Sequence, residues 1–131
     1  MKISVIIPCY NEESTILKVI QLVHGSLEGE EYEIILVDDA STDNTKKVLE
    51  ESARNNDKVE VFSHDINSGK GAALRTGFNA AIGDVVIIQD ADLEDDPSDY
   101  GKLIKPIQEG RADIVYGSRF KSGDAGRVLY F

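Results

Sequence analysis

Apolar residues recur along this chain with two different spacings, and the two spacings alternate. Short runs rich in Val, Ile, Tyr and Phe predict β-strands; they lie at residues 3–8, 32–39, 59–62, 84–90 and 112–117. Between them, apolar residues three or four positions apart predict helices; these patterns span residues 16–27, 48–53, 74–81 and 100–107. Strands that are apolar on both faces and joined by helices are typical of an α/β fold, a mostly parallel sheet with helices on both faces.

The predicted helices begin near residues that commonly cap helices. Asn11 precedes the first helix and Ser41 or Thr42 precedes the second, while Asp96 and Pro97 precede the fourth. Asp43 is also expected to act mainly as a cap. Within the fourth helix, Pro106 is expected to produce a kink because proline lacks a backbone N–H.

The length, charge and cysteine content narrow the classes of protein. With 131 residues we expect one domain spanning residues 1–131, and no apolar run is long enough to cross a membrane. A single cysteine and no secretion signal favour a cytoplasmic location. The formal net charge of −10 argues against binding to nucleic acid or to anionic membranes. A polyanionic ligand would therefore need a metal ion, a helix N-terminus or a few well-placed basic residues.

A dense acidic segment, DADLEDD, follows the fourth predicted strand. Asp90 and Asp92 are two positions apart, so extended backbone would aim both carboxylates the same way. Oxygen ligands without nearby His or Cys suit Mg²⁺ or Mn²⁺, which would in turn hold a diphosphate. The alternative is a solvated loop that caps the next helix, and we favour this for three other carboxylates, namely Asp95, Asp96 and Asp99.

Two further polar segments lie at predicted strand ends, where α/β sheets bind ligands. One of the pair Asp38 and Asp39 is expected to hydrogen-bond a base or a ribose, and the alternative is a buried turn. In the segment PCYNEE, Tyr10 and Glu12 have the groups to stack on and bond a nucleobase, although ordinary helix capping is favoured on local grounds.

The segment NSGKGAALRTG, residues 67–77, resembles a phosphate-binding loop. Gly69 and Gly71 permit a tight turn with outward-facing N–H groups, and Lys70 adds positive charge. A plain turn into a helix explains the glycines equally well. It is not a Walker A loop, because His64 occupies the place of its first glycine and no Ser or Thr follows the lysine.

The remaining candidate residues favour structural roles. No glycine lies between Met1 and Gly25, so the dinucleotide-binding glycine motif is missing and NAD or FAD binding is disfavoured. His24 and His64 lack the spacing of metal ligands and are expected to be packing or surface residues. Cys9 is expected to be a small buried apolar side chain rather than a nucleophile.

Taken together, the segments PCYNEE, VDDASTD, NSGKGAAL, DADL and GSRF resemble the family 2 inverting glycosyltransferases, which have the Rossmann-like, nucleotide-binding GT-A fold. The resemblance spans residues 3–120. The chain looks most like the branch containing dolichol-phosphate mannose synthases and polyprenyl-phosphate glucosyltransferases.

This resemblance implies a metal-dependent hexosyltransferase with a GDP- or UDP-sugar donor and Mg²⁺ or Mn²⁺. The implied nucleotide-binding residues are Pro8, Tyr10, Glu12, Asp39, Lys70 and Asp90. The implied metal ligands are Asp90, Asp92 and Glu94, and the implied catalytic residues are Asp92 and Arg119. The metal and a basic residue would stabilise the departing nucleoside diphosphate while the acceptor attacks from the opposite face.

The implied acceptor is a polyprenyl phosphate, such as a dolichyl or undecaprenyl phosphate. A phosphate is already an anionic nucleophile, whereas a sugar hydroxyl, the alternative acceptor, would need a carboxylate base. A non-catalytic nucleotide- or metal-binding module is a further alternative. A phospho-receiver domain is disfavoured because its acidic pair would follow the first strand.

Proteins that resemble this chain continue past GSRF into an acceptor-binding half. We therefore expect a fragment of a longer catalytic domain, truncated before that half, which in its full-length form works at the membrane surface. The apolar residues 128–131 would be exposed unless self-association covers them.

Overall fold

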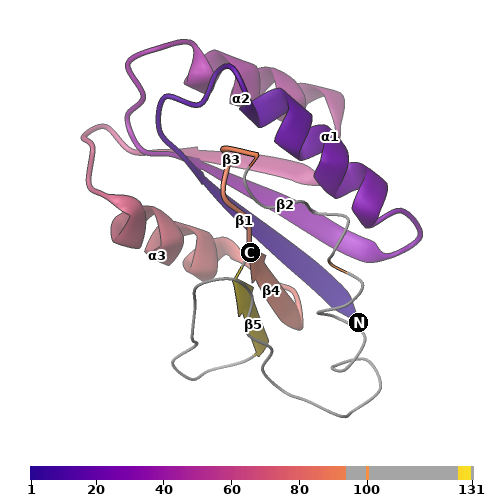
Figure 1. The fold of residues 1–131 in the computed structure, drawn as a ribbon. Helices are drawn as coiled ribbons and strands as arrows, with labels where there is room; N and C mark the ends of the chain where they lie inside the picture. Colours follow the sequence, from indigo (N-terminus) through magenta and orange to yellow (C-terminus); the bar gives the residue numbers. More distant parts are fainter. Residues whose placement is uncertain (94–99, 101–126, 131) are drawn as a thin grey trace.

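The computed structural model describes residues 1–93, residue 100 and, by their backbone, residues 127–130. The elements in chain order are β1 (Lys2–Cys9), α1 (Ile16–Ser26), β2 (Glu31–Asp38), α2 (Thr45–Asn55), β3 (Val59–Ser63), α3 (Lys70–Ala80), β4 (Val85–Ile88) and β5 (Arg127–Tyr130). The strands form one sheet in the order β3-β2-β1-β4-β5, and every neighbouring pair is parallel (Figure 1). The α/β fold with a parallel sheet is confirmed.

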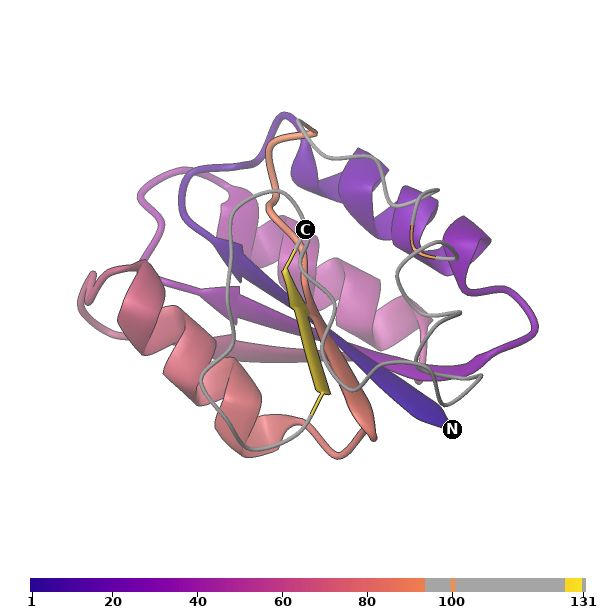
Figure 2. The same cartoon turned by 60° about the horizontal axis from the view of Figure 1, so that its bottom comes forward.

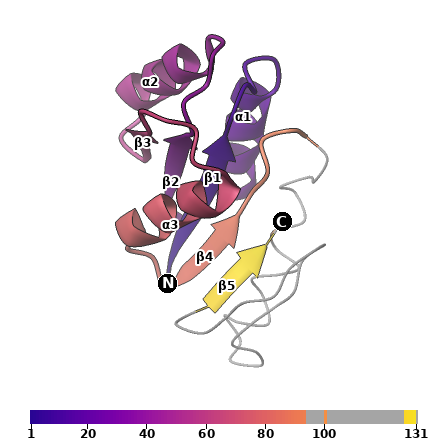
Figure 3. The ribbon, with the colours of Figure 1, turned by 90° about the vertical axis from the view of Figure 1, so that its left-hand side faces the viewer.

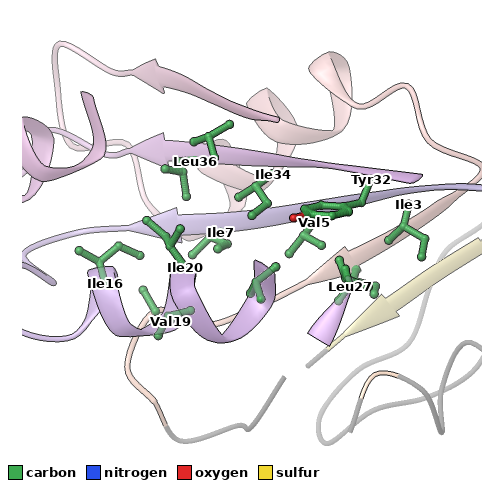
Figure 4. Close-up of a cluster of buried hydrophobic side chains, with 14 of the residues drawn as sticks. Ile3, Val5, Ile7, Ile16, Val19, Ile20, Leu27, Tyr32, Ile34 and Leu36 are labelled. Atoms are coloured by element: carbon green, nitrogen blue, oxygen red, sulfur yellow. The ribbon is translucent and has the colours of Figure 1, made fainter. Parts of the chain in front are cut away.

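The helices cover both faces of this sheet, and α1 and α3 lie on opposite sides of the strands (Figure 2). The face toward α1 carries the larger apolar cluster, in which Val5 and Ile7 of β1 and Leu36 of β2 are fully buried (Figure 4). The alternate residues Ile6 and Ile35 belong to a second cluster, which includes Ala73 of α3. Burying each such side chain contributes about 1.5–3 kcal/mol, so the central strands hold both layers together.

A glycine allows α3 to approach the sheet closely. A Cβ built on Gly77 would lie 2.5 Å from Cγ2 of Ile6 in β1, well inside van der Waals contact. The missing side chain therefore lets the helix backbone rest directly on the central strand. This close packing fixes the position of the N-terminus of α3, which begins at the carboxyl end of the sheet.

Strand β1 does not end at Pro8, the last residue of the run that predicts this strand. Strand β1 continues to Cys9, in register with Asp38 of β2. The backbone of Ile6 bonds toward β4, accepting from the N–H of Gln89 at 2.9 Å. The nitrogen of Pro8 faces the same way, but the pairing of β1 with β4 has ended at Ile88, so the missing N–H costs no strand hydrogen bond.

The predicted caps of the first two helices are wrong in position. Helix α1 follows Thr15 rather than Asn11, and α2 follows Asn44 rather than Ser41 or Thr42. The polar residues before each helix form hydrogen bonds between loops instead, as described below. Asp43 does support the start of α2, since its carboxylate accepts the N–H of Thr45 at 2.9 Å.

The C-terminal apolar run is part of the sheet, which the sequence pattern does not predict. The backbone of Arg127–Tyr130 forms β5, which pairs with β4 from Val85 to Ile88. The expected self-association through this run finds no support in the part of the chain that the structure describes. The helix predicted at 100–107, its kink and its capping residues, and the strand predicted at 112–117, lie outside the described residues.

Candidate functional site

Four polar segments meet at the carboxyl end of the sheet, because parallel strands all end on the same side (Figure 3). They follow β1, β2, β3 and β4 and comprise residues 10–15, 39–44, 64–69 and 89–93. This is the end at which open α/β sheets bind their ligands.

Hydrogen bonds between these loops fix their relative positions. The Asn11 side chain accepts the N–H of Thr42 at 2.8 Å, and Ser41 accepts the N–H of Asn11 at 3.0 Å. The Thr15 hydroxyl donates to the carbonyl of Ala91 at 2.6 Å, which joins the start of α1 to the segment after β4. The loops therefore form one connected surface rather than independent turns.

Three of these loops contain a residue other than glycine with left-handed backbone. They are Asn11 (φ 52°), Ala40 (φ 62°) and Leu93 (φ 68°). Asparagine adopts this conformation readily, but for other L-residues it costs about 1–2 kcal/mol. Such strain tends to gather at functional sites, where the surrounding structure holds it in place.

Asp38 and Asp39 point to opposite faces of the sheet, as successive strand residues do. Asp38, only 1% exposed, lies on the side of α1 and α2. Among the described residues, no hydrogen-bond partner reaches its Oδ1 atom. Burial, and then the charges of Asp38 and Glu12, raise the pKa of the Cys9 thiol, so Cys9 is the buried, unreactive side chain that its sequence context predicts.

Asp39 organises the loop before α3. Its Oδ1 accepts from Nδ1 of His64 at 2.8 Å and from the N–H of Ser68 at 2.9 Å, and its Oδ2 accepts from the N–H of Gly69 at 2.8 Å. Burial alone would raise the pKa of Asp39, but the hydrogen bonds from Ser68, His64 and Gly69 outweigh it and hold this pKa below its ordinary value. The carboxylate is therefore ionised and already stabilises a turn. This is the buried turn expected as the alternative to a hydrogen bond with a base or a ribose.

The glycine turn differs from the predicted phosphate loop. Gly69 has φ 93°, a conformation that glycine adopts without strain, and α3 begins at the next residue. The N–H groups of Ser68 and Gly69 turn inward to Asp39 instead of facing outward. The positive end of α3 and the Lys70 side chain are the features of this turn that suit an anion.

The acidic segment after β4 divides into a buried and an exposed carboxylate. Strand β4 ends at Ile88, so the extended backbone that would align Asp90 with Asp92 stops before either residue. Asp90 is only 7% exposed and its Oδ1 lies 2.7 Å from Nζ of Lys70, whereas Asp92 is exposed. The pairing of Asp90 with Lys70 joins two segments that are both predicted to bind the nucleotide.

Negative charge accumulates around the start of α1. Burial raises the pKa of Glu12, and the nearby carboxylates of Asp92, Asp43 and Asp90 raise it further, against a hydrogen bond from Thr15 that lowers it. A cation placed among these groups would relieve their repulsion.

The carboxylates at this end of the sheet are suitable ligands for a hard cation such as Mg²⁺. Within the described residues no three His, Cys, Asp or Glu side chains are grouped as a complete metal site. Asp90 and Asp92 supply oxygen ligands alone, and Mg²⁺ is commonly bound through one or two carboxylates with water and substrate phosphates completing its shell. The structure therefore offers part of a site, and the third predicted ligand, Glu94, lies outside the described residues.

The other predicted site residues that the structure describes lie at the same end of the sheet. Pro8 and Glu12 are partly buried, and Tyr10 is 45% exposed, which leaves its ring available for stacking. Arg119 lies outside the described residues. His64 also lies at this end but is not among the predicted site residues, because metal-ligand spacing does not identify it. Its position directly after β3, at the carboxyl end of the sheet, is the signal that the sequence offers.

The described helices include none that is both long and apolar enough to cross a membrane.

The model of glycosyl transferase family 2 matches residues 4–130. The chain is 42% identical over 117 residues to an undecaprenyl-phosphate 4-deoxy-4-formamido-L-arabinose transferase of Proteus mirabilis, covering 87% of this chain and 36% of the relative. It is 40% identical over 124 residues to a dolichol-phosphate mannosyltransferase of Pyrococcus furiosus, covering 94% of this chain and 34% of the relative. The chain thus spans about a third of the length of these relatives.

Solved structures with a similar fold include nucleotide complexes. S. aureus TarS in complex with UDP is 26% identical with a TM-score of 0.75, covering 95% of this chain and 38% of that one. Glucosyl-3-phosphoglycerate synthase of Mycobacterium tuberculosis, in complex with Mn²⁺, UDP and phosphoglyceric acid, is 30% identical with a TM-score of 0.69, covering 88% and 43%. The mannosyltransferase PcManGT of Pyrobaculum calidifontis, in complex with GDP-mannose and Mn²⁺, is 25% identical with a TM-score of 0.75, covering 89% and 35%.

Proposed function

This chain belongs to glycosyl transferase family 2, and we propose that it forms the donor-binding part of a metal-dependent, inverting glycosyltransferase. The donor is a GDP- or UDP-sugar and the acceptor is a polyprenyl phosphate. The observation that carries the proposal is the pairing of Lys70 with Asp90 at the carboxyl end of the sheet, at the N-terminus of α3, with the exposed Asp92 two residues further along the chain.

Each group at this end has a role that its chemistry supports. Tyr10, Pro8 and Glu12 form one side of the nucleoside site, with the exposed ring of Tyr10 stacking on the base. The Lys70 side chain is 46% exposed although its ammonium group contacts Asp90, so it can also face a donor phosphate. Asp39 stabilises the turn before α3, and its carboxylate oxygens can accept a further hydrogen bond from the donor.

Asp92 and Asp90, with Glu94, are the residues that would hold Mg²⁺ or Mn²⁺. When bound, such an ion supplies positive charge that stabilises the departing nucleoside diphosphate. The names of the structural neighbours support this assignment, since two of them are complexes with Mn²⁺ and a nucleotide or nucleotide-sugar. Arg119 is proposed as a second positive group near the phosphates, on the family pattern GSRF.

A lipid phosphate acceptor is supported by two of the relatives, whose names include undecaprenyl-phosphate and dolichol-phosphate. A phosphate monoester is already anionic near neutral pH and needs no general base. We therefore expect the reaction to occur at a membrane surface, because the acceptor phosphate is attached to a lipid. Transfer to a sugar hydroxyl would instead require a carboxylate base.

Donor binding tests the proposal directly. The melting temperature of the chain should rise with GDP or UDP only when MnCl₂ is present, because a ligand of the native state stabilises it by about 2.7 kcal/mol at a hundredfold excess over Kd. Asp92→Ala should abolish the metal-dependent rise. Asp57→Ala, at an exposed aspartate before β3, is the matched control and should keep it.

Two outcomes would count against this function. A rise with nucleotide that is the same with EDTA and in Asp92→Ala would remove the metal from the proposal. If the nucleotide binds but the full-length gene product transfers no labelled sugar to undecaprenyl phosphate or to dolichyl phosphate, the chain acts as a binding module or uses another acceptor.

A further inference from the structure

A histidine links three elements beside the proposed donor site. Nδ1 of His64 lies 2.8 Å from Oδ1 of Asp39, and its Nε2 lies 2.7 Å from Oγ1 of Thr76. Asp39 follows β2, His64 follows β3 and Thr76 lies in α3. Both ring nitrogens are therefore used, and the ring cannot turn without breaking two hydrogen bonds.

The partners determine which nitrogen carries the proton. An ionised carboxylate only accepts hydrogen bonds, so Nδ1 of His64 must donate to Asp39. The Thr76 hydroxyl contacts both Nε2 of His64, at 2.7 Å, and the carbonyl oxygen of Ala72, at 3.2 Å, and its one proton can be donated to only one of them at a time. The His64 backbone is fixed as well, because its N–H donates to the carbonyl of Asp38 at 2.8 Å.

The histidine bond decides how the carboxylate of Asp39 is oriented. With Oδ1 held by His64, Oδ2 faces the turn and accepts the N–H of Gly69. The carboxylate also bonds the N–H of Ser68, and the Asn67 side chain donates to the Asp39 carbonyl at 3.1 Å. The whole turn before α3 is thus built on one oriented carboxylate, whose side chain is 6% exposed.

This turn also positions the lysine of the proposed donor site. Gly69, held by Asp39, is followed directly by Lys70, whose ammonium contacts Asp90. A continuous series of contacts therefore runs from His64 through Asp39 and Gly69 to the Lys70–Asp90 pair. It connects the end of β3 to the end of β4, on the α3 side of the sheet.

We propose that His64 is a positioning residue of the donor site: it orients Asp39, and through Asp39 the turn that places Lys70 beside Asp90. This inference rests on the proposed function, since it assigns His64 to the binding of the nucleotide-sugar. His64 touches no reacting atom in this role. It pre-organises the anion-binding turn, so that less ordering is needed when the donor binds.

The chain contains a matched control for the experiment. His24 also makes a side-chain hydrogen bond, from Nδ1 to the Tyr32 hydroxyl at 2.7 Å, but it lies in α1 near the amino end of the sheet. Replacing either histidine removes a histidine hydrogen bond. Only the replacement of His64 should affect the donor site.

The test measures the Kd of GDP or UDP with MnCl₂ by calorimetry, using whichever nucleotide the wild-type chain binds. His64→Ala should weaken binding about 10- to 100-fold, as loss of a hydrogen bond to a buried charge does. His64→Asn should restore most of the affinity, because its amide can donate to Asp39 in place of Nδ1. His24→Ala, which removes the bond to Tyr32, should bind as the wild type does, even if its melting temperature falls.

Thr76→Val, which leaves His64 in place but removes its second partner, should weaken binding about threefold. This variant carries the test if His64→Ala does not fold. Unchanged affinity in folded His64→Ala, unchanged affinity in Thr76→Val, or an equal loss in His24→Ala overturns the positioning role. A wild-type chain that binds neither nucleotide with Mn²⁺ overturns the proposed function itself, which is a distinguishable result.

Discussion

The two ends of the sheet use their polar atoms in opposite ways. At the amino end, Glu33 accepts from the Ser4 hydroxyl at 2.6 Å and from the N–H of Ile82 at 2.8 Å, while Ser4 accepts the N–H of Gly83 at 2.8 Å. These bonds fasten the turn between α3 and β4 to the central strand. Every one of these groups has its partner within the chain.

At the carboxyl end the polar groups are not satisfied in the same way. The buried Oδ1 of Asp38 has no partner among the described residues, and Asn11, Ala40 and Leu93 hold left-handed backbone. The carboxylates around Glu12 repel one another. The comparison indicates that one end of the sheet is built for stability, while the other keeps charge and strain that a ligand can use.

The amino end should therefore be the place where a small change costs most stability. A Cβ on Gly83 would lie 2.6 Å from Oγ and 2.7 Å from N of Ser4, and 2.9 Å from the carbonyl oxygen of Lys2. Two of these atoms are backbone and cannot move aside cheaply. We expect Gly83→Ala to lower the free energy of unfolding by about 2–3 kcal/mol, measured by urea denaturation.

Gly25→Ala is the control for that measurement. Apart from its chain neighbours and the nearby backbone of α1 itself, no described atom lies within 4 Å of a Cβ built at Gly25, which is in α1. Alanine is favoured over glycine in a helix, so this variant should gain about 0.5–1 kcal/mol. Equal effects of the two substitutions would show that the close contacts at the amino end do not matter.

The sequence predicts the broad features that this comparison depends on. Alternating strand and helix patterns predict the parallel sheet, and parallel strands must bring Asp39, Lys70 and Asp90 to one end. What it cannot predict is how these groups pair. The bonds from His64 to Asp39 and from Lys70 to Asp90 join residues 25 and 20 positions apart, and such contacts depend on the packing of α3 rather than on local patterns.

Backbone conformation is the second feature that the sequence does not predict. Asn11 is a common capping residue, and its position before α1 predicts that role. In the structure it instead connects the loops after β1 and β2, with left-handed backbone. Ala40 gives no signal at all, since alanine rarely adopts positive φ, and only the fixed positions of Asp39 and Ser41 on either side account for it.

Strain at Ala40 can be released by one substitution. Glycine avoids the cost of φ 62° but loses more conformational entropy on folding, so Ala40→Gly should gain about 0.5 kcal/mol. Ala53→Gly in α2, where the backbone is helical, should lose about 1 kcal/mol. Urea denaturation measures both, and a loss of stability in Ala40→Gly would show that the strain is absent. We also expect weaker nucleotide binding in Ala40→Gly, because the loop becomes less ordered.

The smallest effect should come from the charge at the carboxyl end, and it depends on pH. Because the pKa of Glu12 is raised in the folded chain, the native state holds this proton more tightly, and stability falls as pH rises from about 4.5 through the raised pKa. Glu12→Gln removes that cost and should raise the melting temperature by about 1–2 °C at pH 7. At pH 4 the gain should be much smaller, since the wild-type carboxyl is then largely protonated in both states.

Glu30→Gln, at an exposed residue before β2, should show no such dependence. A gain of the same size at both pH values would mean that the carboxylates after β1 and β4 do not repel one another, and the contrast between the two ends would then rest on backbone strain alone.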